Sequence, residues 1–304
     1  MQLIKPDVNI DFIGKRNVAF ILSAVLILVG MVSLVVKGGP NYGVDFAGGT
    51  LVQLQFSEVT TAEQIKKVLI PQPLTAATVQ QFGDEANEFL IRTQETETDL
   101  QGLRGKILQS LGDHYGVENV DMRRIEMVGP QVGEELRTQG VMAILYAMIG
   151  ILIYVTWRFE FRFAVGAIVA LLHDVLLTLG AFSLFGKEID LPIIAAFLAI
   201  IGYSLNDTII VYDRIRENMG KHIDSGFAFT VNRSINETLS RTILTSTTTL
   251  LVVLALFIFG GGVIHNFAFA LLIGVLVGTY SSIFVASPLL IVWDSRKAKS
   301  SSAQ

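Results

Sequence analysis

Six long apolar runs limit what this chain can fold into. Each holds about 20 residues with few or no charges, the length that an α-helix needs to cross the hydrocarbon core of a bilayer. The runs are 18–36, 140–157, 163–185, 191–212, 242–259 and 267–293. Only 16% of the 304 residues are charged, against roughly 25% in an average soluble domain. The sequence therefore predicts an α-helical membrane protein with six transmembrane helices.

Lysine and arginine in the short loops predict the orientation, because cytoplasmic loops carry an excess of both. With the N-terminus inside, the two short outer loops, 186–190 and 260–266, contain only Lys187. The inner side carries Lys5, Lys15, Arg16, Arg158, Arg162, Arg214, Arg216, Lys221, Arg233, Arg241, Arg296, Lys297 and Lys299. We therefore expect residues 1–17 and 294–304 to be cytoplasmic and residues 37–139 to be exported.

The exported segment alternates between strand and helix patterns. Strands are expected over 50–56, 77–82, 88–93 and 117–128, and helices over 61–69 and 99–111. The turn of the central hairpin is placed at Gly83, Asp84 and Glu85. The order β-α-β-β-α-β is that of a ferredoxin-like domain. The chain is thus predicted to be a periplasmic ferredoxin-like domain, 37–139, between the first helix, 18–36, and a five-helix bundle, 140–293.

The chemistry that most enzymes need is missing from the sequence. There is no cysteine, and the four histidines, at 114, 173, 222 and 265, fall in separate regions. We find no nucleophile–base pair, phosphate loop or metal-ligand cluster, and no basic block that would track nucleic acid. His114 is interpreted as a solvated residue beside a helix end. The sequence argues against an enzyme and predicts no cofactor and no metal.

Ionisable residues inside the predicted spans need a reason, because each costs about 2.5–3.5 kcal/mol in a membrane. Asp207 lies about 24 Å below the outer end of its helix, and Arg241 about 27 Å below the outer end of the next. The two can therefore form a pair in which Arg241 stabilises a proton-responsive carboxylate. The alternative is that Arg241 reaches the lipid headgroups and Asp207 is hydrated.

Asp174, near the middle of span three with His173 beside it, permits two interpretations. It is either a second proton-relay carboxylate or a packing residue bonded to hydroxyls such as Ser204, Ser246 and Thr248. Since neighbours on a helix point about 100° apart, His173 and Asp174 are not expected to face one partner. Asn206 is interpreted as structural or, with Ser246 and Thr248, as a polar lining of the same path.

Three motifs carry a family resemblance. They are Gly-Val-Asp-Phe-Ala-Gly-Gly-Thr at 43–50, Val-Gly-Pro-Gln-Val-Gly-Glu-Glu-Leu at 128–136, and the set formed by Asn206-Asp207-Thr208, 213–218 and 236–242. Together with the six-span layout, they resemble the SecF family, the smaller-subunit family of the SecD–SecF complex of bacterial protein export, within the RND superfamily.

The resemblance implies a multi-pass protein of the bacterial inner membrane that pairs with SecD. The pair would associate with the SecYEG channel, and with YajC and YidC as further candidate partners. It would use the proton motive force to help preprotein across after SecA has acted. Asp207 and Arg241 match positions that the family implicates in proton coupling.

Two other functions remain open at the level of sequence. Half of an RND-type exporter of lipids or small solutes would need a larger exported portion. A purely structural assembly factor would tolerate neutralisation of Asp207 and Arg241.

Overall fold

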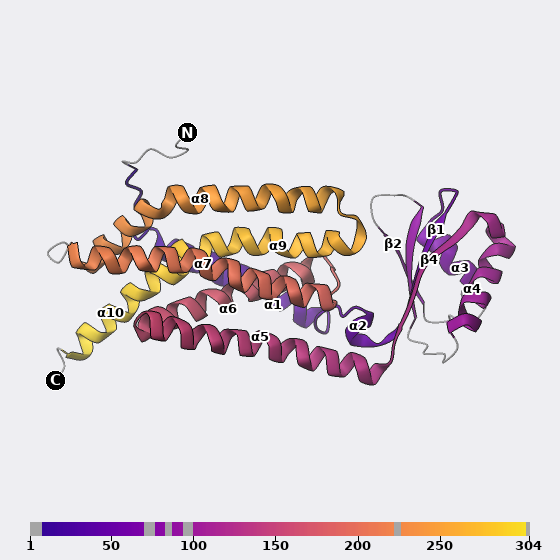
Figure 1. Cartoon of the computed structure of the whole chain (residues 1–304), viewed down its shortest axis with the longest axis horizontal. Coiled ribbons are helices and arrows are strands. Elements are labelled where there is room, and N and C mark those ends of the chain that lie inside the picture. The colour runs from indigo at the N-terminus through magenta and orange to yellow at the C-terminus, as the bar shows by residue number, and fades with distance from the viewer. Residues whose placement is uncertain (1–7, 70–76, 83–86, 94–99, 222–225, 302–304) are drawn as a thin grey trace.

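The computed structural model describes residues 8–69, 77–82, 87–93, 100–221 and 226–301. A helical bundle runs along the long axis of the molecule, and a small sheet domain lies at one end (Figure 1). Helix α10 and the start of helix α1 both lie toward the end away from the sheet. The expected turn at 83–85, the first residue of the helix expected over 99–111, and His222 lie outside the described residues.

The expected six apolar helices are present among the described residues. They are α1 (Arg16–Val36), α5 (Pro130–Arg158), α6 (Phe161–Leu184), α7 (Leu191–Lys221), α8 (Phe227–Phe259) and a last span, Ile264–Ser295. The last span is built from α9 (Gly261–Ser281), a π-helical segment η3 (Ser282–Ala286) and α10 (Ser287–Ser301).

Several helices are longer than the apolar runs that predicted them. α5 begins at Pro130 rather than 140, α7 continues to Lys221 rather than 212, and α8 begins at Phe227 rather than 242. Hydropathy detects only the part of a helix that avoids water. Polar turns that continue a helix beyond the lipid keep their backbone hydrogen bonds and add length without an apolar signal.

The sheet domain, which the sequence predicts to be exported, has the expected β-α-β-β-α-β order. The elements are β1 (Gly49–Phe56), α3 (Ala62–Leu69), β2 (Thr78–Gln81), β3 (Glu88–Thr93), α4 (Leu100–Tyr115), the short helix η1 (Val117–Asn119) and β4 (Val120–Val128). The strands form one antiparallel sheet in the order β2-β3-β1-β4. The last strand begins at Val120 rather than 117, because the three residues before it form η1.

One face of this sheet makes the core of the domain. Alternate residues of β1, Val52, Leu54 and Phe56, are fully or almost fully buried. They pack with Ile65 of α3 and Ile107 of α4 in one cluster, so both helices cover the same face. Helix α3 starts with a reciprocal cap, in which the Gln64 amide N–H donates to Thr61 Oγ1 and the Thr61 amide N–H donates to Gln64 Oε1.

The first two motifs meet at the junction of the sheet domain and the bundle. Residues 43–50 contain a short helix, α2 (Val44–Ala47), which packs against α5. Gly48 has φ +73°, and a Cβ on it would lie 2.8 Å from Pro130 Cα. A Cβ on Gly133 would lie 3.0 Å from the Phe46 carbonyl oxygen. Gly48 of the first motif and Gly133 of the second are thus required for the close approach of α2 to α5.

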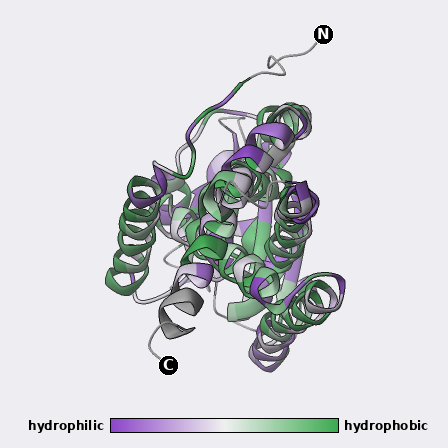
Figure 2. Ribbon diagram, turned by 90° about the vertical axis from the view of Figure 1, so that its left-hand side faces the viewer, coloured by the Kyte–Doolittle hydropathy of each residue, from purple (hydrophilic) through white to green (hydrophobic). Residues whose placement is uncertain are grey.

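Small residues also set the helix contacts within the membrane. A Cβ on Gly30 of α1 would lie 2.7 Å from Gly180 Cα of α6, so the two backbones touch there. On α9, Gly274 and Gly278 lie against Ile200 and Ser204 of α7. Such glycines allow helices to pack closely without a hydrophobic driving force. Viewed from the end away from the sheet, green apolar residues cover much of the bundle helices (Figure 2).

Candidate functional site

Asp174 is bonded to two other helices in the centre of the bundle. Its side chain is 1% exposed, and its Oδ2 accepts hydrogen bonds from Ser204 Oγ of α7 at 2.5 Å and Ser281 Oγ of α9 at 2.8 Å. The expected bond from Ser204 is therefore confirmed. Ser246 and Thr248 do not bond it among the described residues, and Ser281 was missed because hydropathy does not reveal which serine of a long span faces inward.

His173 links Asp174 to α1. Its Nδ1 lies 2.9 Å from Asp174 Oδ1, and its Nε2 lies 2.9 Å from Ser23 Oγ of α1. The ring stacks on Tyr280 of α9, with the ring centroids 6.0 Å apart. The expectation that His173 and Asp174 face no common partner is only partly met: His173 contacts α1 and Asp174 contacts α7, but both also contact α9, and their bond to each other was not predicted. A fully bonded ionisable pair of this kind is costly to break.

Asp207 is equally buried but almost without donors. It is 1% exposed, and the side-chain donor nearest to it among the described residues is Ser246 Oγ, 3.5 Å from Oδ2. Ser246 Oγ lies closer to Thr279 Oγ1, at 2.7 Å, and Thr279 itself donates to the Val275 carbonyl. The single Ser246 proton is therefore directed to Thr279. Asp207 is left as a buried carboxyl group with little hydrogen bonding.

Arg241 is placed differently from the expected partner of Asp207. Its side chain is exposed, and no ion pair within 4 Å joins it to Asp207 in the described part of the chain, although its positive charge acts on Asp207 at longer range. Arg241 instead lines a cavity of about 330 Å³ together with Asp213, Glu217 and Glu237. The cavity lies where α7 and α8 continue beyond their apolar parts.

The other residues expected to line a polar path are divided between the interior and the surface. Ser246 is buried, whereas Asn206 and Thr248 are exposed. The Thr248 hydroxyl donates to the Leu244 and Thr245 carbonyls of its own helix. Thr248 and Asn206 therefore do not share the interior with Asp174 and Asp207. Their exposure places polar groups on the outer sides of α7 and α8.

The third motif also anchors the N-terminal segment. Asn236 accepts a hydrogen bond from the Ile10 amide N–H at 2.8 Å, and Asn232 accepts one from the Phe12 amide N–H at 2.9 Å. Asn218 donates to Ser234 Oγ and Glu237 Oε2, which joins α7 to α8. The role of Asn232 was missed, although its spacing of four from Asn236 puts both on one helix face.

Two further carboxylates lie at the N-terminal end of α7. Asp45 Oδ2 accepts a hydrogen bond from the Leu191 amide N–H, and Asp190 Oδ1 accepts one from the Ile193 amide N–H. Burial raises the pKa of Asp190 to about 6, and the negative charges of Asp45 and Glu188 add to the increase. Glu188 also forms an ion pair with Arg92 of β3, which ties the sheet domain to the α6–α7 connection.

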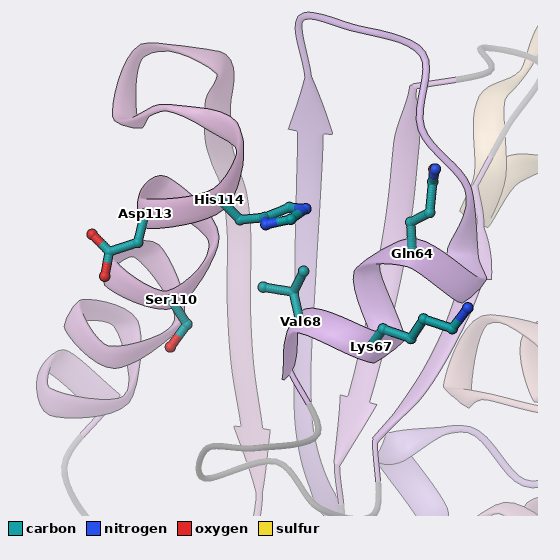
Figure 3. A pocket seen from close by; sticks show the side chains of 6 residues that line it. All are labelled: Gln64, Lys67, Val68, Ser110, Asp113 and His114. Atoms are coloured by element: carbon teal, nitrogen blue, oxygen red, sulfur yellow. The ribbon is translucent and has the colours of Figure 1, made fainter.

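A hollow also lies in the sheet domain, between α3 and α4. Its volume is about 500 Å³, and it is lined by Gln64, Lys67, Val68, Ser110, Asp113 and His114. Lys67 and Asp113 point away from each other, and only His114 and Val68 face across the space between the helices (Figure 3). His114 is exposed at the end of α4, as expected. The polar groups do not converge on a point where a ligand atom would be held.

Nothing in the described residues assembles a metal site. No group of three or more histidine, aspartate or glutamate side chains lies close enough there to hold a metal ion. The candidate functional residues inside the bundle are therefore the two buried aspartates, Asp174 and Asp207, with the hydroxyl groups that contact them.

Comparison with known proteins identifies the family. Residues 107–296 match the family of the protein export membrane protein SecD/SecF, C-terminal, and residues 32–58 match the SecD/SecF GG motif. The chain is 49% identical to the protein translocase subunit SecF of Desulfurispirillum indicum, over 94% of this chain and 92% of the relative. It is 48% identical to SecF of Magnetococcus marinus, over 97% and 95% of the two chains.

A solved structure shows the same fold. The crystal structure of SecDF, a translocon-associated membrane protein from Thermus thermophilus, matches with a TM-score of 0.88 and 38% identity over 96% of this chain. This chain spans 40% of the length of that SecDF chain. SecDF in its super-membrane-facing form matches with a TM-score of 0.71 at the same identity. The chain therefore belongs to the SecF family of bacterial protein translocase subunits, which are multi-pass proteins of the inner membrane.

Proposed function

We propose that this chain works with a SecD partner as an accessory subunit of the Sec translocase and uses the proton motive force to drive preprotein export. One observation carries the proton-coupling part of this proposal. Asp207 is buried, yet its best-placed donor is directed elsewhere. A proton that neutralises such a carboxylate removes the cost of a desolvated charge. Asp207 is therefore suited to bind and release a proton.

Arg241 supplies the positive charge that this cycle needs. It lines the polar cavity at the inner ends of α7 and α8, and its charge acts on Asp207 without a fixed ion pair. A locked ion pair would hold Asp207 ionised, whereas a cation at longer range lowers the cost of the charge and leaves the carboxylate free to be protonated. Asp174 is held by hydrogen bonds from Ser204 and Ser281 and would take part in the relay only together with His173.

The surface of the bundle agrees with a membrane partner. Arg241, Thr245 and Thr248 have polar groups on a side of α8 that also carries the exposed apolar residues Leu244 and Leu251. Lipid covers apolar side chains well and cationic ones poorly. We propose that SecD covers the polar part of this face, that lipid covers the rest, and that the assembled pair contacts SecYEG and preprotein, with YajC and YidC as further partners.

The effect of a proton reaches the exported domain through the junction described above. Movement of one proton charge across the membrane supplies about 2.3 kcal/mol per 100 mV. That is enough to bias two arrangements of packed helices but not to unfold a substrate outright. The two SecDF structures match this chain with different TM-scores, 0.88 and 0.71. The difference supports the proposal that proteins of this family adopt more than one arrangement of their helices and domains.

The orientation is part of the proposal. Both termini are cytoplasmic, and the sheet domain is periplasmic, because of the excess of lysine and arginine on the inner side. The chain contains no cysteine, so single cysteines at about position 90, 160, 263 and 300 report one site each. In intact spheroplasts, an impermeant thiol reagent should label cysteines near 90 and 263 and leave those near 160 and 300 unlabelled. The reverse pattern would overturn this orientation.

The coupling itself is tested by Asp207→Asn, which keeps the shape of the side chain and removes its titratable charge. Inverted vesicles that contain the complex are assayed for preprotein export with and without an ionophore. We expect Asp207→Asn and Arg241→Met to abolish the stimulation of export that depends on the gradient, and to leave insertion and SecD association intact. The control is Asp121→Asn, an exposed residue of β4 that is paired with Arg123 and lies far from the bundle, which should retain the stimulation.

Normal gradient-dependent export by Asp207→Asn would contradict the mechanism. The chain would then be better explained as a structural assembly factor. The double variant Asp207→Arg with Arg241→Asp should not restore export, because the two positions have different roles. Asp207 is enclosed, and Arg241 lies in an open cavity.

A further inference from the structure

We propose that His173 and Asp174 hold one proton between them, and that release of this proton requires α1 to change its contact with α9. His173 would thereby act as a positioning residue that links the central carboxylate to the helix that leads into the exported domain. The role of this link in export rests on the proposed function. The shared proton follows from hydrogen-bond geometry alone.

The count of donors begins at Tyr280. Its hydroxyl donates to the Ala19 carbonyl of α1 at 2.8 Å. A phenol has one proton, so Tyr280 accepts in its second contact, with Ser23 Oγ at 3.1 Å. Ser23 is therefore the donor in that contact, and its only proton is used there. It follows that Ser23 Oγ must accept from His173 Nε2, which lies 2.9 Å away and carries a proton.

A neutral imidazole has only one N–H group, and that proton is now on Nε2. Nδ1 of His173 lies 2.9 Å from Asp174 Oδ1. Two lone pairs at this distance repel each other, so a second proton must lie between the two atoms. It belongs to an imidazolium that faces a carboxylate or to a carboxylic acid that faces a neutral ring. In either form, the pair contains one proton more than an ionised aspartate with a neutral histidine.

No neighbouring group of the described residues supplies or takes up the proton between His173 Nδ1 and Asp174 Oδ1. α1 presents Ser23, α7 presents Ser204 with Asp207 three residues further along, and α9 presents Tyr280 and Ser281. Ser204 and Ser281 both donate to Asp174 Oδ2, so they compensate charge on that oxygen and bring no proton to Oδ1. No lysine, arginine or glutamate of the described residues bonds the pair. With the extra proton the pair is neutral overall, which suits its burial.

Loss of the proton changes the contact with α1. An ionised Asp174 requires the remaining ring proton on Nδ1, so Nε2 becomes an acceptor. Ser23 must then turn its proton from Tyr280 to Nε2. The oxygens of Ser23 and Tyr280 would be left 3.1 Å apart with no proton between them. Either Tyr280 turns its proton from the Ala19 carbonyl to Ser23, or the two helices move apart, and in both cases a contact between α1 and α9 is lost.

α1 is suited to transmit such a shift. It crosses α6 at Gly30 and Gly180, and its outer end is held by the hydroxyl contact of Ser33 with Ser183 at 2.8 Å. Its outer end then leads to residues 43–50, which pack on α5 under the sheet domain. The protonation of the pair is thus joined by a continuous set of contacts to the junction with the exported domain.

The test is solid-state NMR of the full chain in lipid vesicles with ¹⁵N-labelled histidine. The difference between the chain and His173→Gln isolates the signal of His173 from the other three histidines. If His173→Gln does not insert, His114→Gln, His222→Gln and His265→Gln are combined instead. At neutral pH we expect a protonated Nε2 and an Nδ1 in a shared hydrogen bond. A neutral ring with its proton on Nδ1 and a bare Nε2 would overturn the proposal.

Tyr280→Phe provides the second measurement. It frees the Ser23 proton to donate to Nε2, so the neutral ring with its proton on Nδ1 becomes compatible with an ionised Asp174. The ratio of His173 with the shared proton to His173 without it should fall by about fivefold at a given pH, the effect of a single hydrogen bond of about 1 kcal/mol.

The matched control is Ser183→Ala, which removes a hydroxyl contact between α6 and α1 away from the pair and should leave the spectrum unchanged. An unchanged spectrum in Tyr280→Phe would contradict the link to α1. Neither result depends on whether Asp207→Asn loses gradient-dependent export, so failure of this inference and failure of the proposed function are distinguishable.

Discussion

Asp174 and Asp207 lie on packed helices and are both 1% exposed, yet their environments differ. Asp174 accepts hydrogen bonds from hydroxyls of α7 and α9 and contacts His173, whereas the described residues give Asp207 one side-chain hydrogen bond, 3.5 Å long. Burial alone therefore does not distinguish a carboxylate held by several donors from one that can change its protonation state at little cost. The number of committed donors does, because each donor that must be abandoned adds to the cost of a change of state.

The difference predicts unequal stability effects on removal of the two side chains, and this is the largest effect we expect. Asp174→Ala leaves Ser204, Ser281 and His173 without their acceptor in a buried site and should destabilise the folded chain by about 3–5 kcal/mol. Asp207→Ala leaves Ser246 bonded to Thr279 and should cost less than about 1 kcal/mol. Thermal unfolding in detergent measures both. Equal losses would show that the two sites do not differ as described.

A third aspartate, Asp190, extends the comparison to the outer end of α7. Its pKa is raised to about 6 by burial, so the folded chain binds a proton that the unfolded chain has released between about pH 4 and pH 6. Stability is therefore highest below this window and falls as the pH rises through it, by up to about 1.4 kcal/mol per pH unit. Asp190→Asn should flatten this dependence and stabilise the chain at neutral pH.

The control for this prediction is Asp213, whose side chain is 44% exposed. Asp213→Asn should leave the pH dependence of the unfolding midpoint unchanged. A chain with Asp190→Asn that still loses stability between about pH 4 and pH 6 would assign the effect to another group.

The smallest expected difference is in the free energy of unfolding lost when Ser204 or Ser246 is replaced by alanine. Ser204→Ala removes a hydrogen bond of 2.5 Å to Asp174 and should cost about 1.5–3 kcal/mol, the range for a bond to a charged group. Ser246→Ala removes the long contact with Asp207 and one bond to Thr279, and should cost about 1 kcal/mol. Unfolding midpoints of the two variants in one detergent give the comparison. A larger cost for Ser246→Ala would mean that Asp207 is held more firmly than its geometry indicates.

The independent folding of the exported domain stays a prediction of the same kind. Its core is closed by residues of its own sheet and two helices, such as Leu54, Ile65 and Ile107. Residues 40–135, expressed alone, should therefore give a dispersed NMR amide spectrum and mixed α/β circular dichroism. A random-coil spectrum would show that the junction with the bundle is required.

Much of the architecture could be predicted because it depends on local patterns. Apolar length determined six spans, and alternation together with turn residues determined the β-α-β-β-α-β order of the exported domain. The depth of Asp207 and Arg241 also follows from a fixed rise per residue. The motifs led to the correct family because they combine these local features in one order along the chain.

Which side chains meet was decided only by the tertiary structure. A helix can be rotated about its axis without changing its hydropathy or its length, so the sequence did not reveal that Ser281 faces Asp174, that Thr248 faces outward, or that Arg241 lies in an open cavity. The bond between His173 and Ser23 joins positions 150 residues apart. Contacts of this kind arise where glycines such as Gly30, Gly180 and Gly278 let two helices approach closely. Which helices become neighbours depends on the packing of the whole bundle.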